Sequence, residues 1–216
     1  MHSLLSSGLS QALFNLRTEL RLWLRHRKGS YKARRYPQSA LDKLHLGCGP
    51  NRKPGWLNVD LSMPADLALD LREKFPFPDN SFSVIYSEHF FEHIDYPVAA
   101  GNFLAECFRV LKSGGLIRIG VPDTEWPLQE YCKVRNDGYF HLSQESWHPQ
   151  WCTTEMEHIN YHFRQDGEHR FAYDFETLLK VLKAAGFSDV SKTGFDPDID
   201  SESRKTGTLY VRAVKP

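Results

Sequence analysis

A glycine-containing turn followed by an acid is the part of this sequence best suited to hold a nucleotide-like ligand. The apolar run Leu44-His45-Leu46 leads into Gly47-Cys48-Gly49. Glycine has no Cβ, so such a turn lets the backbone approach a ligand closely. A second run, Leu57-Asn58-Val59, ends in Asp60. An acid at the tip of a strand can accept hydrogen bonds from both hydroxyls of a ribose, so the pair predicts a site for a ligand with an adenosine-like ribose.

Histidines are the residues best suited to acid–base chemistry, because their ordinary pKa lies near neutrality. Five of the ten histidines and three of the five tryptophans lie between Asp123 and Asp174, an interval with little periodicity. We interpret residues 124–173 as a substrate-side insertion, with a small helical subdomain that has its own aromatic core as the plainer alternative. His158 and His162 lie one helical turn apart and could share a face.

The segment His89-Phe90-Phe91-Glu92-His93 spells H-x-x-E-H, a zinc-protease pattern in which two histidines on one helical face bind the metal. A zinc hydrolase that uses His89, Glu92 and His93 is therefore a remote alternative. No third ligand is identifiable, and the sequence predicts no bound metal. We expect His93 to bond a neighbouring loop and His89 to face a pocket.

Strand and helix signals alternate from Lys43 onward, which favours a parallel sheet covered by helices. Apolar helical spacing predicts helices over residues 97–112 and 175–185. The second of these is capped by Asp174 and ended by Gly186. The predicted strands cover residues 43–47, 56–60, 65–70, 82–87, 116–121, 190–193 and 208–214.

The first 40 residues differ in charge from the rest of the chain. They contain eight basic residues and one acidic residue, a net charge of +7, whereas the remainder carries −7. Residues 4–27 read as an amphipathic helix that Gly29-Ser30 ends, and a basic linker follows to Pro37. We favour packing of this helix on the acidic body; peripheral contact of residues 4–35 with a membrane surface is the alternative.

The whole chain has the composition of an ordinary globular domain. Of its 216 residues 41% are hydrophobic and 25% charged, and no apolar run is long enough to span a membrane. The four cysteines show no C-x-x-C spacing and there is no signal-peptide pattern, so we expect a reducing, cytoplasmic setting. We divide the chain into an N-terminal helix and linker (1–40) and a catalytic domain (41–216).

Five segments, taken in order, resemble class I S-adenosylmethionine-dependent methyltransferases, close to the type 11 group. The resemblance covers residues 43–123 and 173–214. It implies a seven-stranded, mostly parallel Rossmann-like α/β sheet with helices on both faces, and S-adenosylmethionine as the cofactor. The matching segments are LHLGCGP, LNVD, ALDLREKFPFPDNSFSVIYSEHFFEHI, RVLKSGGLIRIGVPD and FETLLKVLKAAGFSDV.

The resemblance also implies the residues that hold the cofactor. The glycine turn receives the methionine part, Asp60 and Leu61 lie at the ribose, and Asp70 with Leu71 lies at the adenine. The backbone after the fourth predicted strand lies beside the methionyl group and faces the substrate. The implied cofactor residues are Gly47, Cys48, Gly49, Asp60, Leu61, Asp70, Leu71, Ser87 and Glu88.

Two departures from the family pattern affect the cofactor site. The family usually has an acid where this chain has His45. Only 13 positions separate Gly47 from Asp60, too few for a full helix between two strands. We therefore expect a more open pocket at the amino-acid end and a modest cofactor affinity. The missing helix also counts against a dinucleotide dehydrogenase, whose pyrophosphate needs a helix N-terminus.

The function that follows is methyl transfer, an in-line displacement in which the enzyme chiefly aligns the reacting atoms. A hydroxyl acceptor also needs a general base, for which His89, His158 and His162 are the candidates. Asp123, Trp126 and Arg164 are the candidate substrate-binding residues. The predicted acceptor is a small molecule or a saccharide, methylated at oxygen. Nucleic acid is disfavoured because the catalytic body is acidic; a non-catalytic cofactor-binding module docked by the basic helix is the alternative.

Overall fold

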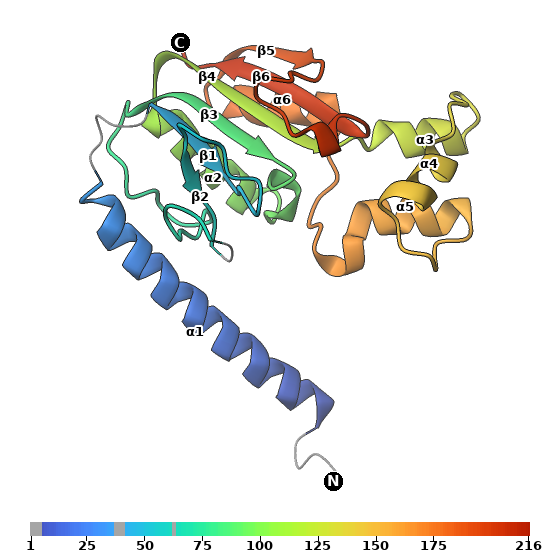
Figure 1. The fold of residues 1–216 in the computed structure, drawn as a ribbon, viewed down its shortest axis with the longest axis horizontal. Helices are drawn as coiled ribbons and strands as arrows, with labels where there is room; N and C mark the ends of the chain where they lie inside the picture. Colours follow the sequence, from blue (N-terminus) through green and yellow to red (C-terminus); the bar gives the residue numbers. More distant parts are fainter. Residues whose placement is uncertain (1–5, 37–41, 62–63) are drawn as a thin grey trace.

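The computed structural model describes residues 6–36, 42–61 and 64–216 and contains a six-stranded sheet (Figure 1). The strand order is β2-β1-β3-β4-β6-β5; pairs among β1 to β4 are parallel, and β6 runs antiparallel to β4 and β5. The elements are α1 (Ser7–Ala33), β1 (Lys43–Leu46), β2 (Leu57–Val59), β3 (Phe82–Glu88), η1 (Phe91–His93), α2 (Val98–Val110), β4 (Leu111–Pro122), α3 (Glu125–Tyr131), α4 (Tyr139–Ser146), α5 (Glu155–Arg164), η2 (Gln165–Gly167), α6 (Phe175–Ala184), β5 (Ser188–Thr193), η3 (Glu202–Arg204) and β6 (Thr208–Val214).

The α/β fold class is confirmed, but the prediction of seven strands is wrong by one. Residues 65–70 were expected to form a strand and instead make a single bridge between Val59 and Leu67. The side chain of Asp66 explains the loss. Its Oδ2 accepts hydrogen bonds from both the backbone and the side-chain nitrogen of Asn58, at 2.9 and 3.0 Å. A side chain thus takes a backbone donor of β2 that a neighbouring strand would otherwise use.

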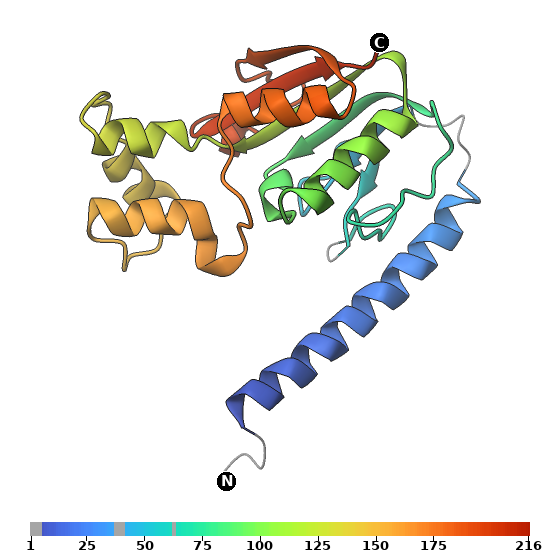
Figure 2. The same ribbon diagram turned by 180° about the vertical axis from the view of Figure 1, so that it is seen from behind.

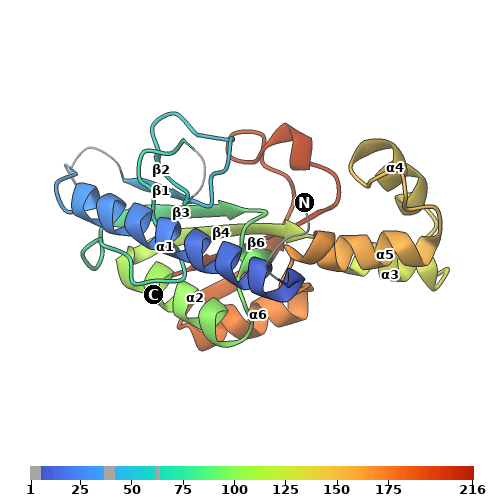
Figure 3. The same ribbon diagram turned by 90° about the horizontal axis from the view of Figure 1, so that it is seen from below.

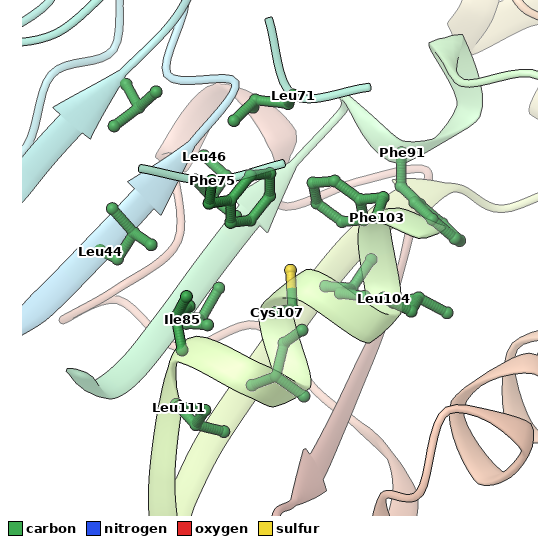
Figure 4. Close-up of a cluster of buried hydrophobic side chains, with 14 of the residues drawn as sticks. Leu44, Leu46, Leu71, Phe75, Ile85, Phe91, Phe103, Leu104, Cys107 and Leu111 are labelled. Carbon is green, nitrogen blue, oxygen red and sulfur yellow. The ribbon is translucent and has the colours of Figure 1, made fainter. Parts of the chain in front are cut away.

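One face of the sheet carries the hydrophobic core. Alternate strand residues such as Leu44, Ile85 and Ile117 point to this face and are fully buried. Helices α2 and α6 cover it together, as Figures 2 and 3 show. Figure 4 shows side chains of α2 packed against those of the strands, and Leu178 and Leu182 of α6 belong to the same core. The periodicity that predicted both helices therefore reflects their contact with this core.

The opposite face is polar, which departs from the expectation of helices on both faces. His45, Tyr86, Arg118 and Tyr210 point to it and are buried. Among the described residues, loops cover this face. Lys53 from the first loop lies over the Tyr86 ring and donates to the carbonyl of Ile199. The chain between Gly47 and Asp60 contains no helix, as its short length predicted.

The Arg118 guanidinium anchors the β5–β6 loop to the polar face. It pairs with the buried Asp200 and donates to Thr193 and to the carbonyl of Gly194. This loop continues into η3 and reaches the end of the sheet where β3 and β4 terminate. The ion pair therefore fixes the position of the β5–β6 loop, which the sequence pattern did not predict.

The insertion between β4 and α6 is a small helical unit at the carboxyl ends of the strands (Figure 1). Its centre is the buried Tyr139, which contacts Trp126, His148 and His162. Thr154 and Glu157 form a capping box that begins α5. The helical-subdomain alternative thus describes this segment correctly, and the unit also lines a cavity.

Helix α1 projects from the body (Figures 1 and 2), and its described contacts with the body come from its C-terminal half, from Glu19 onward. It runs through Gly29-Ser30, which were expected to end it; a Cβ on Gly29 would lie 1.9 Å from the carbonyl oxygen of Ala68. Packing of the whole apolar face on the body is wrong, because its large side chains are exposed. These are Leu9, Leu13, Phe14, Leu16, Leu20, Trp23 and Leu24. Residues 4–5, the linker segment 37–41 and the division at residue 40 lie outside the described residues.

Candidate functional site

The cofactor edge is defined as Gly47–Gly49, Asp60, Asp70 and Ser87–Glu88. All of it except Asp70 lies at the carboxyl ends of three parallel strands, and Asp70 follows the bridge between Val59 and Leu67. Leu46 is in register with both Val59 and Ser87, so the segments that follow β1 and β2 and the end of β3 meet at one edge. The backbone nitrogen of Gly49 donates to Asp60 Oδ2 over 3.0 Å. Nothing lies within 4 Å of a Cβ built on Gly49, so the turn leaves room for a ligand beside the carboxylate.

Gly47 is required by packing as well as by its backbone. Its φ is +66°, and an added Cβ would lie 2.2 Å from Cγ of Phe90. Phe90 precedes η1 and contacts Phe103 of α2. The first glycine of the turn therefore serves close contact between the cofactor edge and the segment after β3.

The two unusual residues near the turn are held by the protein itself. His45 is buried, and its Nδ1 lies 3.2 Å from Oδ1 of Asn58; burial lowers its pKa to about 4. It therefore takes a structural place on the polar face. Burial raises the pKa of the Cys48 thiol to about 11, so this cysteine is a packing residue and not a nucleophile.

Asp70, expected at the adenine, already has a strong partner. Arg72 Nε and Nη2 donate to its two carboxylate oxygens, at 2.9 and 2.6 Å. The backbone nitrogen of Asp70 donates to His26 Nδ1 of α1 over 3.0 Å. Leu71 is buried, and the carbonyl of Leu61 accepts from Arg25. The end of α1 thus adjoins the positions assigned to the adenosine.

The end of β3 carries two buried polar side chains, of which one forms hydrogen bonds to described residues and the other forms none. The Ser87 hydroxyl is buried and has no hydrogen-bond partner among the described residues. Glu88 Oε1 accepts from the Tyr210 hydroxyl at 2.9 Å and from the Ser201 nitrogen at 3.2 Å. A buried hydroxyl without a partner at this edge fits a site completed by a bound ligand.

A cavity of about 340 Å³ opens directly beyond the cofactor edge. Four segments build it: the turn after β3, the end of β4, the helical insertion, and the loop that leads to β6. Its lining residues are His89, Glu92, His93, Pro122, Tyr139, Trp147, His148, Tyr161, His162, Gln165, His169, Ser203, Arg204, Thr206 and Gly207. We call it the acceptor cavity.

His89 follows Glu88 directly and reaches the acceptor cavity, as predicted. Its Nε2 shares a hydrogen bond of 2.8 Å with the Thr208 hydroxyl, and its Nδ1 lies 3.6 Å from Oε1 of Glu92. Its φ is +51°, a left-handed conformation that is costly for a residue other than glycine. Burial lowers the pKa of the ring well below its ordinary value, so the imidazole is neutral at pH 7.

Glu92 is a buried carboxyl with no hydrogen-bond partner for either side-chain oxygen within the described ranges. It is 2% exposed, and burial raises its pKa to about 8. The backbone holds it in place, because its carbonyl accepts from the nitrogens of Arg170 at 2.8 Å and Phe171 at 3.2 Å. These two bonds bring the segment after η2 against η1.

The two histidines of α5 have different surroundings. His162 lines the acceptor cavity; its Nδ1 lies 2.9 Å from the Tyr139 hydroxyl and its buried Nε2 has no partner in the described chain. Burial lowers its pKa to about 3. His158 does not line this cavity. Its Nδ1 lies 2.7 Å from Nδ1 of His148, so the structure gives no support for His158 as a base.

The three residues expected to bind substrate lie outside the acceptor cavity. Asp123 Oδ1 accepts from the backbone nitrogen of Glu125, the first residue of α3. Trp126 is buried in the insertion and donates to Asp137. Arg164 is exposed beside a different hollow. Each of these side chains thus has a structural or surface position.

The H-x-x-E-H reading fails on local structure. Phe91–His93 form a three-residue 3₁₀ turn, and His89 precedes it with a φ of +51°, so the segment is not the α-helix that would place both imidazoles on one face. His93 Nδ1 donates to the carbonyl of Glu168 over 3.0 Å, so this histidine bonds a neighbouring loop as expected.

Several cavity residues carried no usable signal in the sequence. Tyr139, Tyr161, Ser203 and Arg204 belong to no motif, and neither does Thr208, the partner of His89. Thr208 lies 119 positions from the histidine that it contacts. Only the tertiary fold brings such pairs together.

Comparison with known proteins agrees with the fold. Residues 44–119 match the family model of a methyltransferase domain. Phosphoethanolamine N-methyltransferase 2 of Haemonchus contortus, solved with phosphomonomethylethanolamine and S-adenosylhomocysteine, has a TM-score of 0.51 and 16% identity over 82% of this chain. The match covers 49% of that enzyme, so this chain spans about half its length.

Two further structures have the same fold. A SAM-dependent methyltransferase from Archaeoglobus fulgidus has a TM-score of 0.50 and 18% identity, with 90% of this chain and 94% of that chain covered. An exported protein of Bordetella parapertussis, described as possible, has a TM-score of 0.50 and 16% identity over 89% of this chain and 69% of its own. A search of curated proteins finds no match.

Proposed function

We propose that this chain, which contains a class I S-adenosylmethionine-dependent methyltransferase domain, methylates an oxygen atom of a small polar acceptor, either a small molecule or a saccharide unit. The carrying observation is the position of His89. It follows the cofactor edge without a break and lines the acceptor cavity next to it. The position of this imidazole, at the junction of the cofactor edge and the acceptor cavity, is the one that a general base needs.

The residues of the cofactor edge fit S-adenosylmethionine. Asp60 would accept from the ribose hydroxyls, and the open space beside Gly49 would receive the amino-acid part. The Ser87 hydroxyl supplies a buried polar group at the same edge. When bound, the cofactor supplies a methyl group already activated on a sulfonium.

His89 would take the proton of the acceptor hydroxyl. Burial keeps the ring neutral, and a neutral imidazole has one nitrogen free to accept a proton. The Thr208 hydroxyl fixes the ring orientation through Nε2. The walls formed by Tyr139, Trp147 and Tyr161 limit the access of water and hold the acceptor in line with the methyl group.

The cavity supports a small acceptor that carries a negative charge. A volume of about 340 Å³ lies at the lower end of the range for ligand pockets, roughly 300–1,000 Å³. Arg204 lines it, and in the described part of the chain its guanidinium forms no hydrogen bond or ion pair. A phosphate or carboxylate on the acceptor would meet this cation.

Calorimetric titration with S-adenosylhomocysteine tests the cofactor edge first. We expect micromolar binding by the full chain and at least a 30-fold loss in Asp60→Ala, since hydrogen bonds to a charged group contribute about 1.5–3 kcal/mol. Glu145→Ala, an exposed acid of α4, is the matched control and should bind like wild type. Equal binding by Asp60→Ala would contradict the assignment.

An acceptor screen then tests the chemistry through formation of S-adenosylhomocysteine. Hydroxylated sugar phosphates and hydroxy acids are the primary probes. Phosphoethanolamine is included because a neighbour of the same fold is named for methylating it. Turnover only with amines would overturn oxygen as the acceptor atom. The non-catalytic module would be favoured if the protein binds the cofactor tightly, turns over no acceptor, and keeps the same cofactor affinity in His89→Gln.

We also propose that α1 holds the enzyme at an anionic membrane surface, in a cytoplasmic setting. Its exposed leucines, Phe14 and Trp23 flank rows of arginine, the composition of a helix that lies in an interface. None of the described helices combines the length and apolarity needed to span a bilayer. In sedimentation with phosphatidylserine vesicles, we expect the wild type in the vesicle pellet and the double variant Leu13→Glu/Leu20→Glu in the supernatant. A wild type that dimerises and does not bind the vesicles would contradict the proposal.

A further inference from the structure

Three side chains in the wall of the acceptor cavity have the arrangement of a metal site. Glu92, His93 and His169 each offer a ligand atom, and these atoms all lie within 4.8 Å of one another. They come from η1 and from the segment after η2, which the backbone bonds of Glu92 hold together. The sequence offered only two of the three, because the last lies far along the chain.

Each of the two histidines forms a hydrogen bond through Nδ1, which leaves its other ring nitrogen available as a metal ligand. His93 Nδ1 donates to the carbonyl of Glu168 over 3.0 Å, and His169 Nδ1 donates to the carbonyl of His162 over 2.8 Å. A carbonyl can only accept, so both rings carry their proton on Nδ1. Each neutral ring therefore keeps an unprotonated Nε2, and metal-binding histidines are commonly fixed in this way.

The carboxyl group of Glu92 is buried in a way that favours a bound cation. Both of its oxygens are buried and lack a hydrogen-bond partner among the described residues. Oε1 lies 3.9 Å from Nε2 of His93. Burial raises the pKa of this carboxyl group to about 8, so without a cation it is neutral at pH 7, and a bound cation would favour its ionised, ligating form. A cation shared with the two imidazoles would satisfy it.

We propose that Glu92, His93 and His169 bind a divalent transition metal ion of the Zn²⁺ class in the wall of the acceptor cavity. Two nitrogens and one carboxylate oxygen form the donor set of many catalytic zinc sites and leave a position open. Ligand atoms on one tetrahedral zinc lie about 3.3 Å apart, so small rotations of these side chains complete the site.

The role of the ion rests on the proposed function, whereas its binding does not. An ion at this place would coordinate the acceptor hydroxyl and lower its pKa. The hydroxyl proton would pass to His89. The acceptor oxygen would form its bond to the methyl carbon as the carbon–sulfur bond breaks, leaving S-adenosylhomocysteine.

A second group of possible ligands, His148, Cys152 and His158, is a weaker candidate. The Nδ1 atoms of His148 and His158 lie 2.7 Å apart and share one hydrogen bond. That bond already uses a nitrogen of each ring. The second group therefore lacks the unpartnered carboxylate that marks the first.

Arg204 is the charge that opposes a cation at this site. It lines the same cavity and is exposed. Replacing it with a neutral side chain removes repulsion and should strengthen metal binding. A several-fold gain in Arg204→Gln would thus report that the ion enters this cavity.

Titration of the full chain with Co²⁺ and Zn²⁺ after chelator treatment, without cofactor or acceptor, tests the proposal. We expect one equivalent to bind with a micromolar or lower Kd, and visible Co²⁺ absorption without a sulfur charge-transfer band. His169→Ala and Glu92→Gln should each weaken binding at least 30-fold, and Arg204→Gln should strengthen it. His141→Ala, an exposed histidine of α4, is the matched control.

The outcomes separate the two proposals. A sulfur band that Cys152→Ser removes would place the ion at the second group and overturn the assignment. The assignment would also be overturned if no metal binds at up to a 100-fold molar excess, or if His169→Ala binds metal with the same affinity as the wild type. S-adenosylhomocysteine binding is measured on the same variants to show that they fold. Metal binding without methyl transfer would leave the site standing and remove its proposed role.

Discussion

The cofactor edge and the acceptor cavity adjoin each other but are built in different ways. The cofactor edge comes from the ends of neighbouring parallel strands, between Gly47 and Glu88. The cavity draws on four segments, and the contact of His89 with Thr208 joins residues 119 positions apart. The first site is thus determined by local sequence and strand register, and the second depends on long-range contacts that can fail separately.

The ion pair between Arg118 and Asp200 should show the largest effect on stability. Both side chains are buried, and the pair anchors the loop that supplies Ser203 and Arg204 to the cavity. Arg118→Met leaves Asp200 buried without its cation, so we expect a loss of about 3–5 kcal/mol in the free energy of unfolding. Urea denaturation measures this change.

The same variant tests whether the two regions are separable. At a temperature where Arg118→Met is folded, we expect its affinity for S-adenosylhomocysteine to stay within threefold of wild type. The double variant Arg118→Met/Asp200→Leu should recover stability, because no charge is left unpaired. A cofactor affinity that falls as far as in Asp60→Ala would show that the loop belongs to both sites.

Gly47 and Gly49 form a matched pair for the contact between the regions. Both have positive φ, but only at Gly47 would a Cβ collide with Phe90. We expect Gly49→Ala to cost about 1–2 kcal/mol from its backbone alone, and Gly47→Ala about 2 kcal/mol more from overpacking. Thermal or urea unfolding of both variants measures the difference. Equal losses would mean that the Phe90 contact is unimportant, and Phe90→Val should reduce the loss in Gly47→Ala.

His45 gives a smaller effect that depends on pH. Its pKa is about 4 in the folded protein, below the ordinary value of 6.5, because it is buried. Below pH 6.5 the unfolded chain gains a proton that the folded chain does not, so stability falls as the pH is lowered. Between pH 7.5 and 5.5 we expect His45 to contribute about 1 kcal/mol of this loss. His45→Gln should reduce the loss in the free energy of unfolding between these pH values by that amount. An unchanged loss would show that the burial of His45 does not cause this part of the pH dependence.

The sequence predicted the sheet edge well because its signals are local. Gly-x-Gly after an apolar run, an acid at the next strand tip and the helix at residues 175–184 each depend on a few neighbouring residues. The strand expected at residues 65–70 failed because the Asp66 side chain takes the backbone donor of Asn58. Hydrophobic periodicity cannot register such a side-chain bond.

Function-bearing residues were harder to predict where burial determines their role. His158 and His162 look equivalent in the sequence, yet one pairs with His148 and the other lines the cavity. Glu92 was seen only as part of a helix motif, whereas its surroundings make it a buried carboxyl without a partner. Burial and partners arise from packing between distant segments.

The sequence alone determined the α/β class, the methyltransferase resemblance and the position of the glycine turn, because each follows from residues close together in the chain. Tertiary structure decided which histidines reach the cavity, that loops and not helices cover the polar face, and that Glu92, His93 and His169 meet. Those arrangements depend on which backbone and side-chain groups find partners after folding, and the bonds from residues 170 and 171 to Glu92 are the physical reason that the last group exists.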